Sequence, residues 1–393
     1  MVSSILLLII YVAFISLGLP DSVIGAAWPS MYVGLGVPIS WAGVISMIVA
    51  AGTIVSSVLS DRLIRRFGVG RITLVSVLMT ALALLGFALS HHFALLCVLA
   101  IPLGLGAGSV DAALNNYVAN HYAAKHMSWL HCFWGVGATI GPMVMAWGLS
   151  RHDSWHLGYW VIGLLQLALV VVLLVSLPLW QKAAVHHTAS GGLAGASHGA
   201  GGALSIRQIV RLNGVKPVLA AFFCYCSIEA SLGLWGGSYL VLVKQISPEA
   251  AARWVAVYYF GITFGRFLSG FLMMYWSTRR MIRLGQGLIA LGVALMLVSG
   301  LPLFYLGFFL VGLGCAPIFP SLLYETPSNF GKQHSQSVMG VQMASAYVGT
   351  TFAPPLFGWL ATQLGYAWLP VFLAVILLWM VTMVEYLRRK VVH

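Results

Sequence analysis

The chain has 393 residues, of which 60% are hydrophobic and only 7% are charged. A soluble domain carries roughly 25% charged residues, so this composition excludes an ordinary water-soluble protein and indicates that lipid surrounds most of the chain. The formal net charge of +12 would suggest nucleic acid in a soluble protein. Here the basic residues lie in short clusters between apolar runs, which is typical of membrane topology signals, and a nucleic-acid partner is therefore excluded.

Twelve runs of mostly apolar residues follow one another along the chain. Each is long enough to cross a bilayer as a helix, which takes about 20 residues. The first run ends without a convincing cleavage site, so it is expected to be a membrane span rather than a signal peptide. The predicted spans lie at residues 4–31, 41–60, 72–90, 94–118, 129–149, 157–180, 214–242, 251–276, 281–300, 303–326, 335–361 and 367–387. The sequence therefore predicts an all-α membrane protein with twelve transmembrane helices.

The distribution of Lys and Arg predicts the orientation of these spans, because loops on the cytoplasmic side carry an excess of basic residues. If the N-terminus lies inside, most of the 20 basic residues fall in segments on the inner side. We therefore expect a multi-pass protein of a bacterial-type plasma (inner) membrane, with both termini in the cytoplasm.

A polar stretch at residues 181–212 separates the sixth run from the seventh. Its middle, HHTASGGLAGASHGAGGALS, is rich in Gly, Ala and Ser, which is typical of a flexible linker. The histidines of this stretch could suggest metal binding, but histidines spaced in a glycine-rich loop are more often incidental. We expect a cytoplasmic linker between an N-terminal six-helix bundle at 1–180 and a C-terminal six-helix bundle at 213–393.

The two halves resemble each other in sequence. GATIGPMVMAW, which starts at Gly137, aligns with GTTFAPPLFGW, which starts at Gly349, and GLG at Gly104 recurs at Gly312. Spans that are six apart run in the same direction, so the repeat is parallel and its axis lies along the membrane normal. In such pseudo-symmetric proteins the solute site is expected near the midplane, between the two bundles.

Two acids lie well inside apolar runs of the first half, Asp21 in the first and Asp111 in the fourth. A carboxylate at such a position costs roughly 2.5–3.5 kcal/mol on insertion scales, so it usually faces a cavity or a partner. A carboxyl group that gains and loses a proton as access alternates between the two sides is the minimal device for proton coupling. The alternative for both acids is a static hydrogen bond to a neighbouring helix.

Candidate binding residues accompany these acids. Asn115 follows Asp111 by one helical turn, so both point to one face. A carboxyl and an amide together suit a polyhydroxylated ligand, because sugars present donors and acceptors in pairs. On the fifth span, His131 adds a polar group and Trp134 an aromatic surface for a sugar ring. Anchoring at the membrane interface is the alternative for the tryptophan.

The second half offers one further acid inside a span, Glu229 in the seventh run. We predict that it contributes to proton coupling with the two aspartates, because an acid near the centre of a span is again costly. Trp235 and Tyr239 follow on the outward side of the same span, and Gln342 lies on the eleventh. These three are predicted to contact the substrate.

Four motifs resemble the fucose permease branch of the major facilitator superfamily. They are DAALNNYVAN from Asp111, LHCFWGVGATIGP from Leu130, YCSIEASLGLW around Glu229 and APIFPSLLYETP from Ala316. The resemblance implies the major facilitator fold and proton symport of fucose, galactose or glucose. Acids in spans one and four are implicated there in proton coupling and sugar recognition, which the resemblance implies for Asp21 and Asp111. The chain departs from the pattern after Asn115, where another asparagine replaces a proline.

The segment LSDRLIRRFG after the second run resembles the loop signature of the same superfamily. The resemblance implies a conformational latch, in which Asp61 and the arginines Arg62, Arg65 and Arg66 pair with helix ends in one conformer and release them in the other. Anchoring of the arginines at the inner membrane face is the alternative.

No motif indicates an enzyme, since GxSxG, a Walker-type phosphate loop, HExxH and paired cysteines are all missing from the sequence. We expect no cofactor and no metal, and energy from an ion gradient. The leading hypothesis is a monomeric symporter, embedded in the lipid bilayer, for protons and a sugar or similar small polar solute.

Two alternatives remain at this point. The first is a proton-coupled exporter of drugs or amphipathic compounds, because Gly137, Gly141 and Pro142 match half of an exporter motif. The second is a membrane protein that binds without transport, which would give the acids inside the spans no role.

Overall fold

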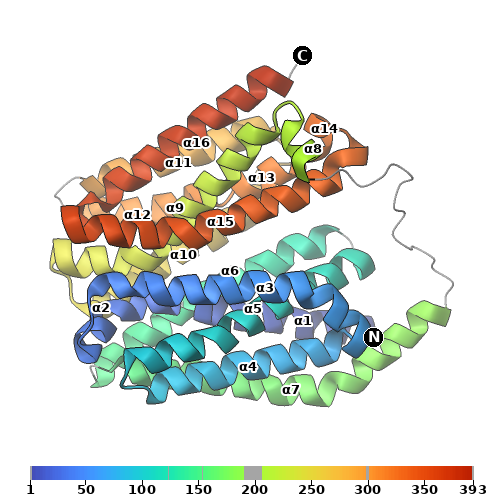
Figure 1. Cartoon of the computed structure of the whole chain (residues 1–393), viewed down its shortest axis with the longest axis horizontal. Helices are drawn as coiled ribbons and strands as arrows, with labels where there is room; N and C mark the ends of the chain where they lie inside the picture. The colour runs from blue at the N-terminus through green and yellow to red at the C-terminus, as the bar shows by residue number, and fades with distance from the viewer. Residues whose placement is uncertain (1, 123, 153, 190–205, 298–300, 392–393) are drawn as a thin grey trace. The chain divides into compact units, whose positions relative to one another are not determined.

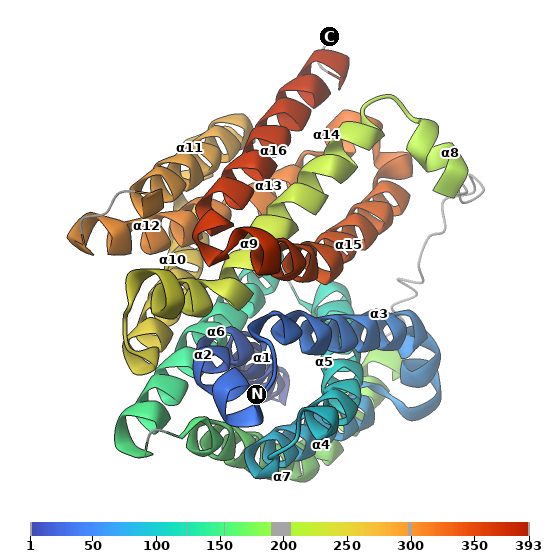
Figure 2. The same cartoon turned by 60° about the vertical axis from the view of Figure 1, so that its left-hand side comes forward.

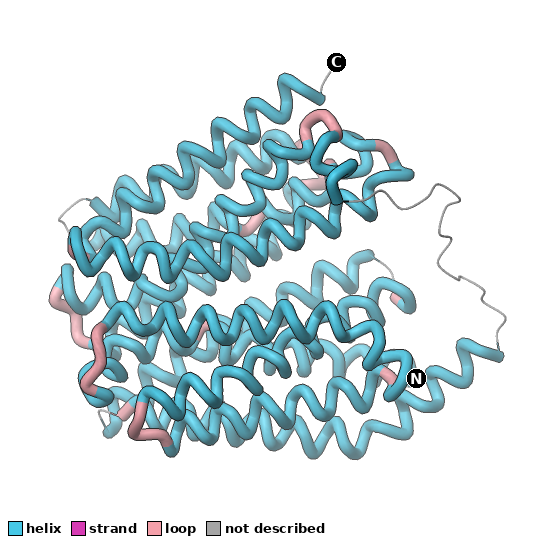
Figure 3. The backbone as a smooth tube through the Cα atoms, in the orientation of Figure 1, coloured by secondary structure: helices cyan, strands magenta, loops and turns pink. Residues whose placement is uncertain are grey.

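The computed structural model describes residues 2–122, 124–152, 154–189, 206–297 and 301–391, and every secondary-structure element among them is a helix (Figures 1 and 3). Two compact units can be distinguished. The first contains α1 to α7 with the segment Leu240–Ala256, and the second contains α8, the remaining parts of α9 and α10, and α11 to α16. The centre of the predicted linker, at 190–205, lies outside the described residues.

The first unit is built mainly from seven α-helices. They are α1 (Val2–Asp21), α2 (Val23–Leu35), α3 (Ala42–Phe67), α4 (Val69–Leu89), α5 (Phe93–His121), α6 (Ala124–His152) and α7 (Trp155–Ala189). Helix α1 packs on α6, α3 packs on α5, and α4 contacts both α5 and α7 (Figures 1 and 2). Each pair buries apolar side chains between helices whose outer faces remain apolar, as expected for helices surrounded by lipid.

The later part of the chain forms nine further α-helices. They are α8 (Ile206–Arg211), α9 (Val215–Lys244), α10 (Pro248–Leu272), α11 (Thr278–Leu297), α12 (Leu301–Cys315), α13 (Ile318–Tyr324), α14 (Thr326–Phe330), α15 (Lys332–Leu364) and α16 (Leu369–Val391). Within the second unit α11 packs on α12 and contacts α13 and α16.

Each of the twelve predicted spans overlaps one or more helices in the part of the chain that the structure describes. Among the described residues, 11 stretches are long and apolar enough to cross a membrane. One of them joins α1 and α2, and another joins α12, α13 and α14. The eleventh predicted span, at 335–361, corresponds to α15, which is 33 residues long but is not among these 11 stretches. The prediction of an all-α membrane protein is confirmed.

The predicted ends differ from the observed ones by several residues because an apolar run marks only the part of a helix inside hydrocarbon. The sixth predicted span, for example, ends at residue 180, whereas α7 continues to Ala189. Polar residues at the membrane surface extend a helix without extending its apolar run.

Glycines of the sequence repeat mark the closest helix crossings in the first unit. A Cβ atom at Gly137 on α6 would overlap the carbonyl oxygen of Ile15 on α1. A Cβ atom at Gly104 on α5 would overlap the carbonyl oxygen of Val49 on α3. Without side chains at these positions the backbones can approach closely, which is how helices associate when lipid surrounds them.

The repeated glycines have the same role in the second unit. A Cβ atom at Gly349 on α15 would overlap the carbonyl oxygen of Phe223 on α9, and one at Gly312 on α12 would overlap that of Tyr258 on α10. In each half, therefore, a glycine lies where the first and fifth spans cross. A second glycine lies where the second and fourth spans cross. The same contacts thus occur inside each unit, which confirms the predicted internal repeat.

Candidate functional site

A break in the first span positions Asp21. Pro20 has no backbone N–H, so the carbonyl of Ser16 one turn earlier loses its helical partner. Gln166 on α7 replaces that partner, because its Nε2 donates to the Ser16 carbonyl at 2.5 Å. The Oγ of Ser16 donates in return to Gln166 Oε1 at 2.5 Å. Helix α1 ends at Asp21 and α2 begins at Val23, so the acid lies at the break.

Trp134 holds the carboxylate of Asp21. The indole Nε1 of this tryptophan, on α6, donates to Asp21 Oδ2 at 2.8 Å. Asp21 is exposed and Trp134 is half-buried, so the pair lies at an open surface of the first unit. The two residues predicted separately for proton exchange and sugar stacking are therefore in direct contact.

Asp111 and Asn115 form a second pair on α5. Asn115 Nδ2 donates to Asp111 Oδ1 at 2.8 Å and to the Asp111 carbonyl at 3.1 Å. Both side chains are half-buried. Helix α5 contacts α1, the helix that ends at Asp21, so both pairs belong to the same helix bundle of the first unit.

Neutral groups, rather than cations, are the observed partners of these two acids. Among the described side chains, no Lys or Arg forms an ion pair with Asp21 or Asp111. His131 is also half-buried, and its ring meets Phe14 edge-on with a centroid distance of 6.0 Å. The first unit thus contains two acids with no opposite charge to neutralise them in the part of the chain that is described.

Glu229 occupies the equivalent position in the second unit. It follows Phe223 by six residues, as Asp21 follows Ile15, and Phe223 and Ile15 meet the equivalent glycines of the repeat. Its surroundings differ, because Arg266 Nη2 on α10 lies 3.6 Å from Glu229 Oε1.

Two tyrosines complete the surroundings of this ion pair. The hydroxyl of Tyr225 donates to Glu229 Oε2, and that of Tyr258 donates to the Glu229 carbonyl at 3.0 Å. The side chains of Glu229 and Arg266 are 18% and 17% exposed. The acid of the second unit therefore has an opposite charge beside it, whereas its equivalent in the first unit is bound by an indole.

Three predicted binding residues lie inside the packing of the second unit. Trp235 is fully buried and donates from Nε1 to the Pro354 carbonyl at 2.7 Å. Tyr239 is buried and its hydroxyl donates to the Met296 carbonyl at 3.1 Å. Gln342 is also fully buried. Their contacts join helices to one another, so we do not include them in the candidate site.

The side chains of the predicted latch are described only in part. Those of Asp61, Arg62 and Arg65 lie outside the described residues. Arg66 is exposed, and its guanidinium lies over the ring of Phe67 at 5.3 Å from the centroid. The latch stays a prediction.

Gln166 is a residue of the candidate site that the sequence reasoning missed. It is the polar residue in the middle of the sixth apolar run, and its side chain is 1% exposed. A polar group in hydrocarbon must have a partner, so its presence signals a contact, but the sequence does not reveal that the partner is a carbonyl freed by Pro20. Its role is to brace the break that places Asp21.

Comparisons with known proteins agree with this architecture. A family model described as Major Facilitator Superfamily matches residues 10–252 and 218–392. The chain is 26% identical over 294 residues to the glucose/mannose transporter GlcP of Bacillus subtilis (strain 168), covering 74% of this chain and 71% of that protein. It is 22% identical over 392 residues to Bypass of stop codon protein 6 of Saccharomyces cerevisiae (strain ATCC 204508 / S288c), covering 91% and 77%.

Solved structures share the fold at low sequence identity. A D-xylose-proton symporter superposes with a TM-score of 0.73 and 12% identity, covering 97% of both chains. A peptide transporter POT in complex with sulfate superposes with a TM-score of 0.72 and 15% identity, covering 97% of this chain and 94% of the other. At these identities the likeness shows the fold alone.

Proposed function

The chain belongs to the Major Facilitator Superfamily, and from this premise we propose that it is a proton-coupled symporter for a sugar or a similar small polar solute. As a member of this family it is a multi-pass membrane transporter of small solutes and not an enzyme. Sugar as the solute class is supported by two names, those of the glucose/mannose transporter GlcP and the D-xylose-proton symporter. The mechanism we propose is alternating access between two bundles, in an inner membrane with both termini in the cytoplasm.

One observation supports the proton coupling: two acids of the first unit are each bound by a neutral donor. Asp21 accepts from Trp134 and Asp111 accepts from Asn115. Neither acid has a described cation partner that would hold it ionised. We therefore assign proton exchange to this pair.

The repeat-related acid has a different assignment. Glu229 faces Arg266 at 3.6 Å, so loss of its charge would leave a cation unpaired inside a span. We propose that Glu229 and Arg266 form a lasting ion pair, and that coupling is concentrated in the first unit.

The same region of the first unit would hold the solute. Trp134 is fixed by its hydrogen bond to Asp21, and a held indole offers an apolar face to a sugar ring. Asn115 and His131 offer polar groups for hydroxyls. Because the tryptophan links solute and proton sites, a bound sugar would influence the protonation of Asp21.

The half-matching exporter motif receives a structural explanation. Gly137 and Gly141 lie where a Cβ atom would overlap the carbonyl oxygens of Ile15 and Leu19. Close packing of α6 on α1 is sufficient reason for both glycines, so they do not favour export. Export is retained as an outcome of the experiment.

The experiment uses the full chain in proteoliposomes with an imposed pH gradient, after a panel of sugars has been screened for thermal stabilisation. We expect a stabilising monosaccharide to accumulate inside when the outside is acidic, and a protonophore to abolish the accumulation. Uptake that ignores both the pH gradient and the membrane potential would exclude proton coupling. Accumulation of a lipophilic dye in inverted vesicles, with no sugar uptake, would identify an exporter instead.

A further inference from the structure

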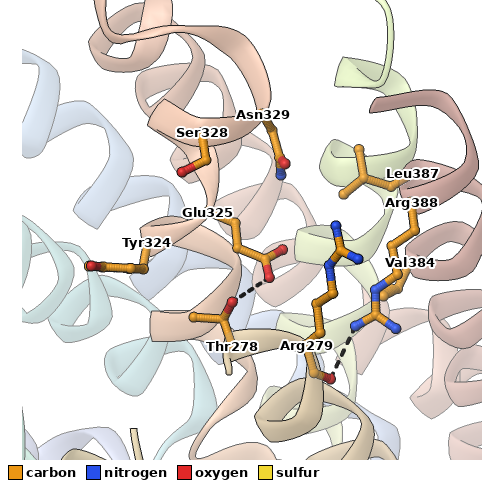
Figure 4. Close-up of a pocket in the computed structure, with 9 residues that line it drawn as sticks. All are labelled: Thr278, Arg279, Tyr324, Glu325, Ser328, Asn329, Val384, Leu387 and Arg388. Atoms are coloured by element: carbon orange, nitrogen blue, oxygen red, sulfur yellow. Dashed lines mark hydrogen bonds between the residues drawn. The ribbon is translucent and has the colours of Figure 1, made fainter. Parts of the chain in front are cut away.

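A pocket of about 210 Å³ lies among the ends of α11, α13, α14 and α16 in the second unit (Figure 4). One water molecule needs only roughly 10–15 Å³ of such space, so the pocket is large enough for a small polar group. Most of its lining is polar or charged, and the residues that matter below are Thr278, Arg279, Glu325, Ser328, Asn329 and Arg388.

Arg388 lines this pocket and has one donor without a partner. Its Nη1 donates to Glu385 Oε1 at 2.7 Å, and its Nη2 donates to the Arg279 carbonyl at 3.1 Å. The Nε of the same guanidinium is buried and has no hydrogen-bond partner, and the side chain is only 11% exposed. A buried N–H without an acceptor is costly, so the hydrogen bonds of this guanidinium are incomplete.

The acids nearby are already engaged. Glu385 also accepts two hydrogen bonds from Arg283, at 3.1 and 3.0 Å, and is therefore shared between two arginines. Glu325 accepts from the hydroxyl of Thr278 at 2.5 Å. Neither carboxylate is available to satisfy the remaining donor of Arg388.

The charge at the pocket favours an anion. The guanidinium of Arg279 extends to the region between Glu325 and Arg388 (Figure 4), so two arginines face one engaged carboxylate. Lys390 and Arg389 follow directly on α16, which adds to the positive charge at this helix end. An anion with several acceptor oxygens, such as a phosphate group, matches the fork geometry of two guanidinium groups.

Exposed aromatic side chains near the pocket are typical of the depth at which lipid headgroups lie. Tyr275 and Trp276, just before α11, are 81% and 40% exposed, and Tyr324 at the pocket is 74% exposed. Tyr386 on α16 is 46% exposed, and the ammonium of Lys390 lies over its ring at 5.6 Å. Tyr and Trp gather at the membrane–water interface, where lipid phosphates also lie.

We propose that this pocket binds a phosphate-bearing anion, supplied by the headgroup of an anionic phospholipid. Basic pockets between membrane helices are suited to such headgroups because charge and hydrogen bonding act together in a poorly hydrated setting. The phosphate oxygens would accept from the guanidinium of Arg279 beside that of Arg388, and the headgroup would contact the hydroxyl of Ser328 and the amide of Asn329. The site would be regulatory, since it is built from residues that the proposed transport site does not use.

The test measures binding to the purified full chain in a neutral detergent by native mass spectrometry and thermal unfolding. The probes are short-chain phosphatidylglycerol, the matching phosphatidylcholine and inorganic phosphate. We expect phosphatidylglycerol to bind most tightly and to raise the melting temperature. Arg279→Gln should weaken its binding about ten-fold, as expected for loss of a charged hydrogen bond. The control Arg389→Gln removes an adjacent positive charge that does not line the pocket and should change the affinity much less.

Two variants keep the test decisive. Arg388→Gln also breaks the contact with Glu385 and could impair folding, whereas the Arg279 side chain forms no described hydrogen bond or ion pair, so its replacement spares the fold. Equal phosphatidylglycerol affinity in wild type and Arg279→Gln would overturn the proposal, and so would equal binding of phosphatidylcholine. Stabilisation by inorganic phosphate that matches the lipid and depends on Arg279 would support the anion site and assign it to a soluble phosphate.

Discussion

Replacing Asp111 by asparagine removes one proton-accepting group and changes little else. The substitution keeps the size of the side chain, and the new Oδ1 can still accept the 2.8 Å hydrogen bond from Asn115 Nδ2. We therefore expect solute binding and conformational exchange to survive in Asp111→Asn, while the coupling to protons is lost.

The expected magnitude follows from the energy of one proton. Movement of one charge down 100 mV supplies about 2.3 kcal/mol. This supports a gradient of roughly fifty-fold in a neutral solute. Wild-type proteoliposomes should approach that accumulation ratio at 100 mV, whereas the Asp111→Asn variant should reach a ratio of about one.

The assay compares two modes of transport in the same proteoliposomes. Counterflow exchange of labelled solute needs no net proton movement and should persist in Asp111→Asn, and gradient-driven accumulation should disappear. The matched control is Glu249→Gln, which neutralises an acid at the start of α10 whose carboxylate accepts only from Ser247 among its described side-chain partners. Full accumulation by Asp111→Asn, with the control unchanged, would refute the assignment of Asp111.

Three further predictions concern the packing that supports the site, and thermal unfolding in detergent measures all of them. Gly137→Ala should lower stability by about 1–3 kcal/mol, because its Cβ would meet the α1 backbone, whereas Gly287→Ala, with open space around it, should not. Gln166→Met should lower the free energy of unfolding by about 1–3 kcal/mol, since it leaves the carbonyl of Ser16 without a donor. Unchanged stability would contradict the role proposed for Gln166. Glu229→Gln alone should lower stability more than the double variant Glu229→Gln/Arg266→Gln, because the single change leaves Arg266 without its ion-pair partner. Equal losses of stability in the two variants would contradict a lasting ion pair.

Much of the architecture could be predicted because lipid imposes a simple rule on the sequence. An apolar run of sufficient length must be a helix, so composition alone locates the spans. The repeat was visible as glycines at matching positions, and the structure explains them as crossings, for example where Gly137 meets Ile15 and Gly349 meets Phe223. The ends of helices were harder to predict, since they lie outside the apolar runs.

The partners of the polar residues could not be predicted in the same way. Glu229 and Arg266 were both visible as charges inside spans, but their pairing depends on how α9 and α10 are rotated toward each other. The contact between Asp21 and Trp134 depends on the break at Pro20, which sets the direction of the carboxylate. Spacing along one helix is local information, as for Asp111 and Asn115, whereas contacts between helices follow from packing.

Two tryptophans with the same predicted role differ in how deeply they are buried. Trp134 and Trp235 were both candidates for stacking on a sugar, yet the first is half-buried beside an acid and the second is fully buried against the carbonyl of Pro354. An aromatic residue on an apolar helix carries no signal of which face is open, because the whole helix surface is apolar in a membrane protein.

Proton movement that is driven by the solute alone tests the central claim most directly. A stabilising monosaccharide is added to lightly buffered proteoliposomes without any imposed gradient, and the external pH is followed with an electrode. The account predicts that the external medium becomes more alkaline as the sugar enters, and that Asp111→Asn abolishes the pH change while sugar still equilibrates. Entry of labelled sugar into wild-type proteoliposomes with no change in external pH would contradict it.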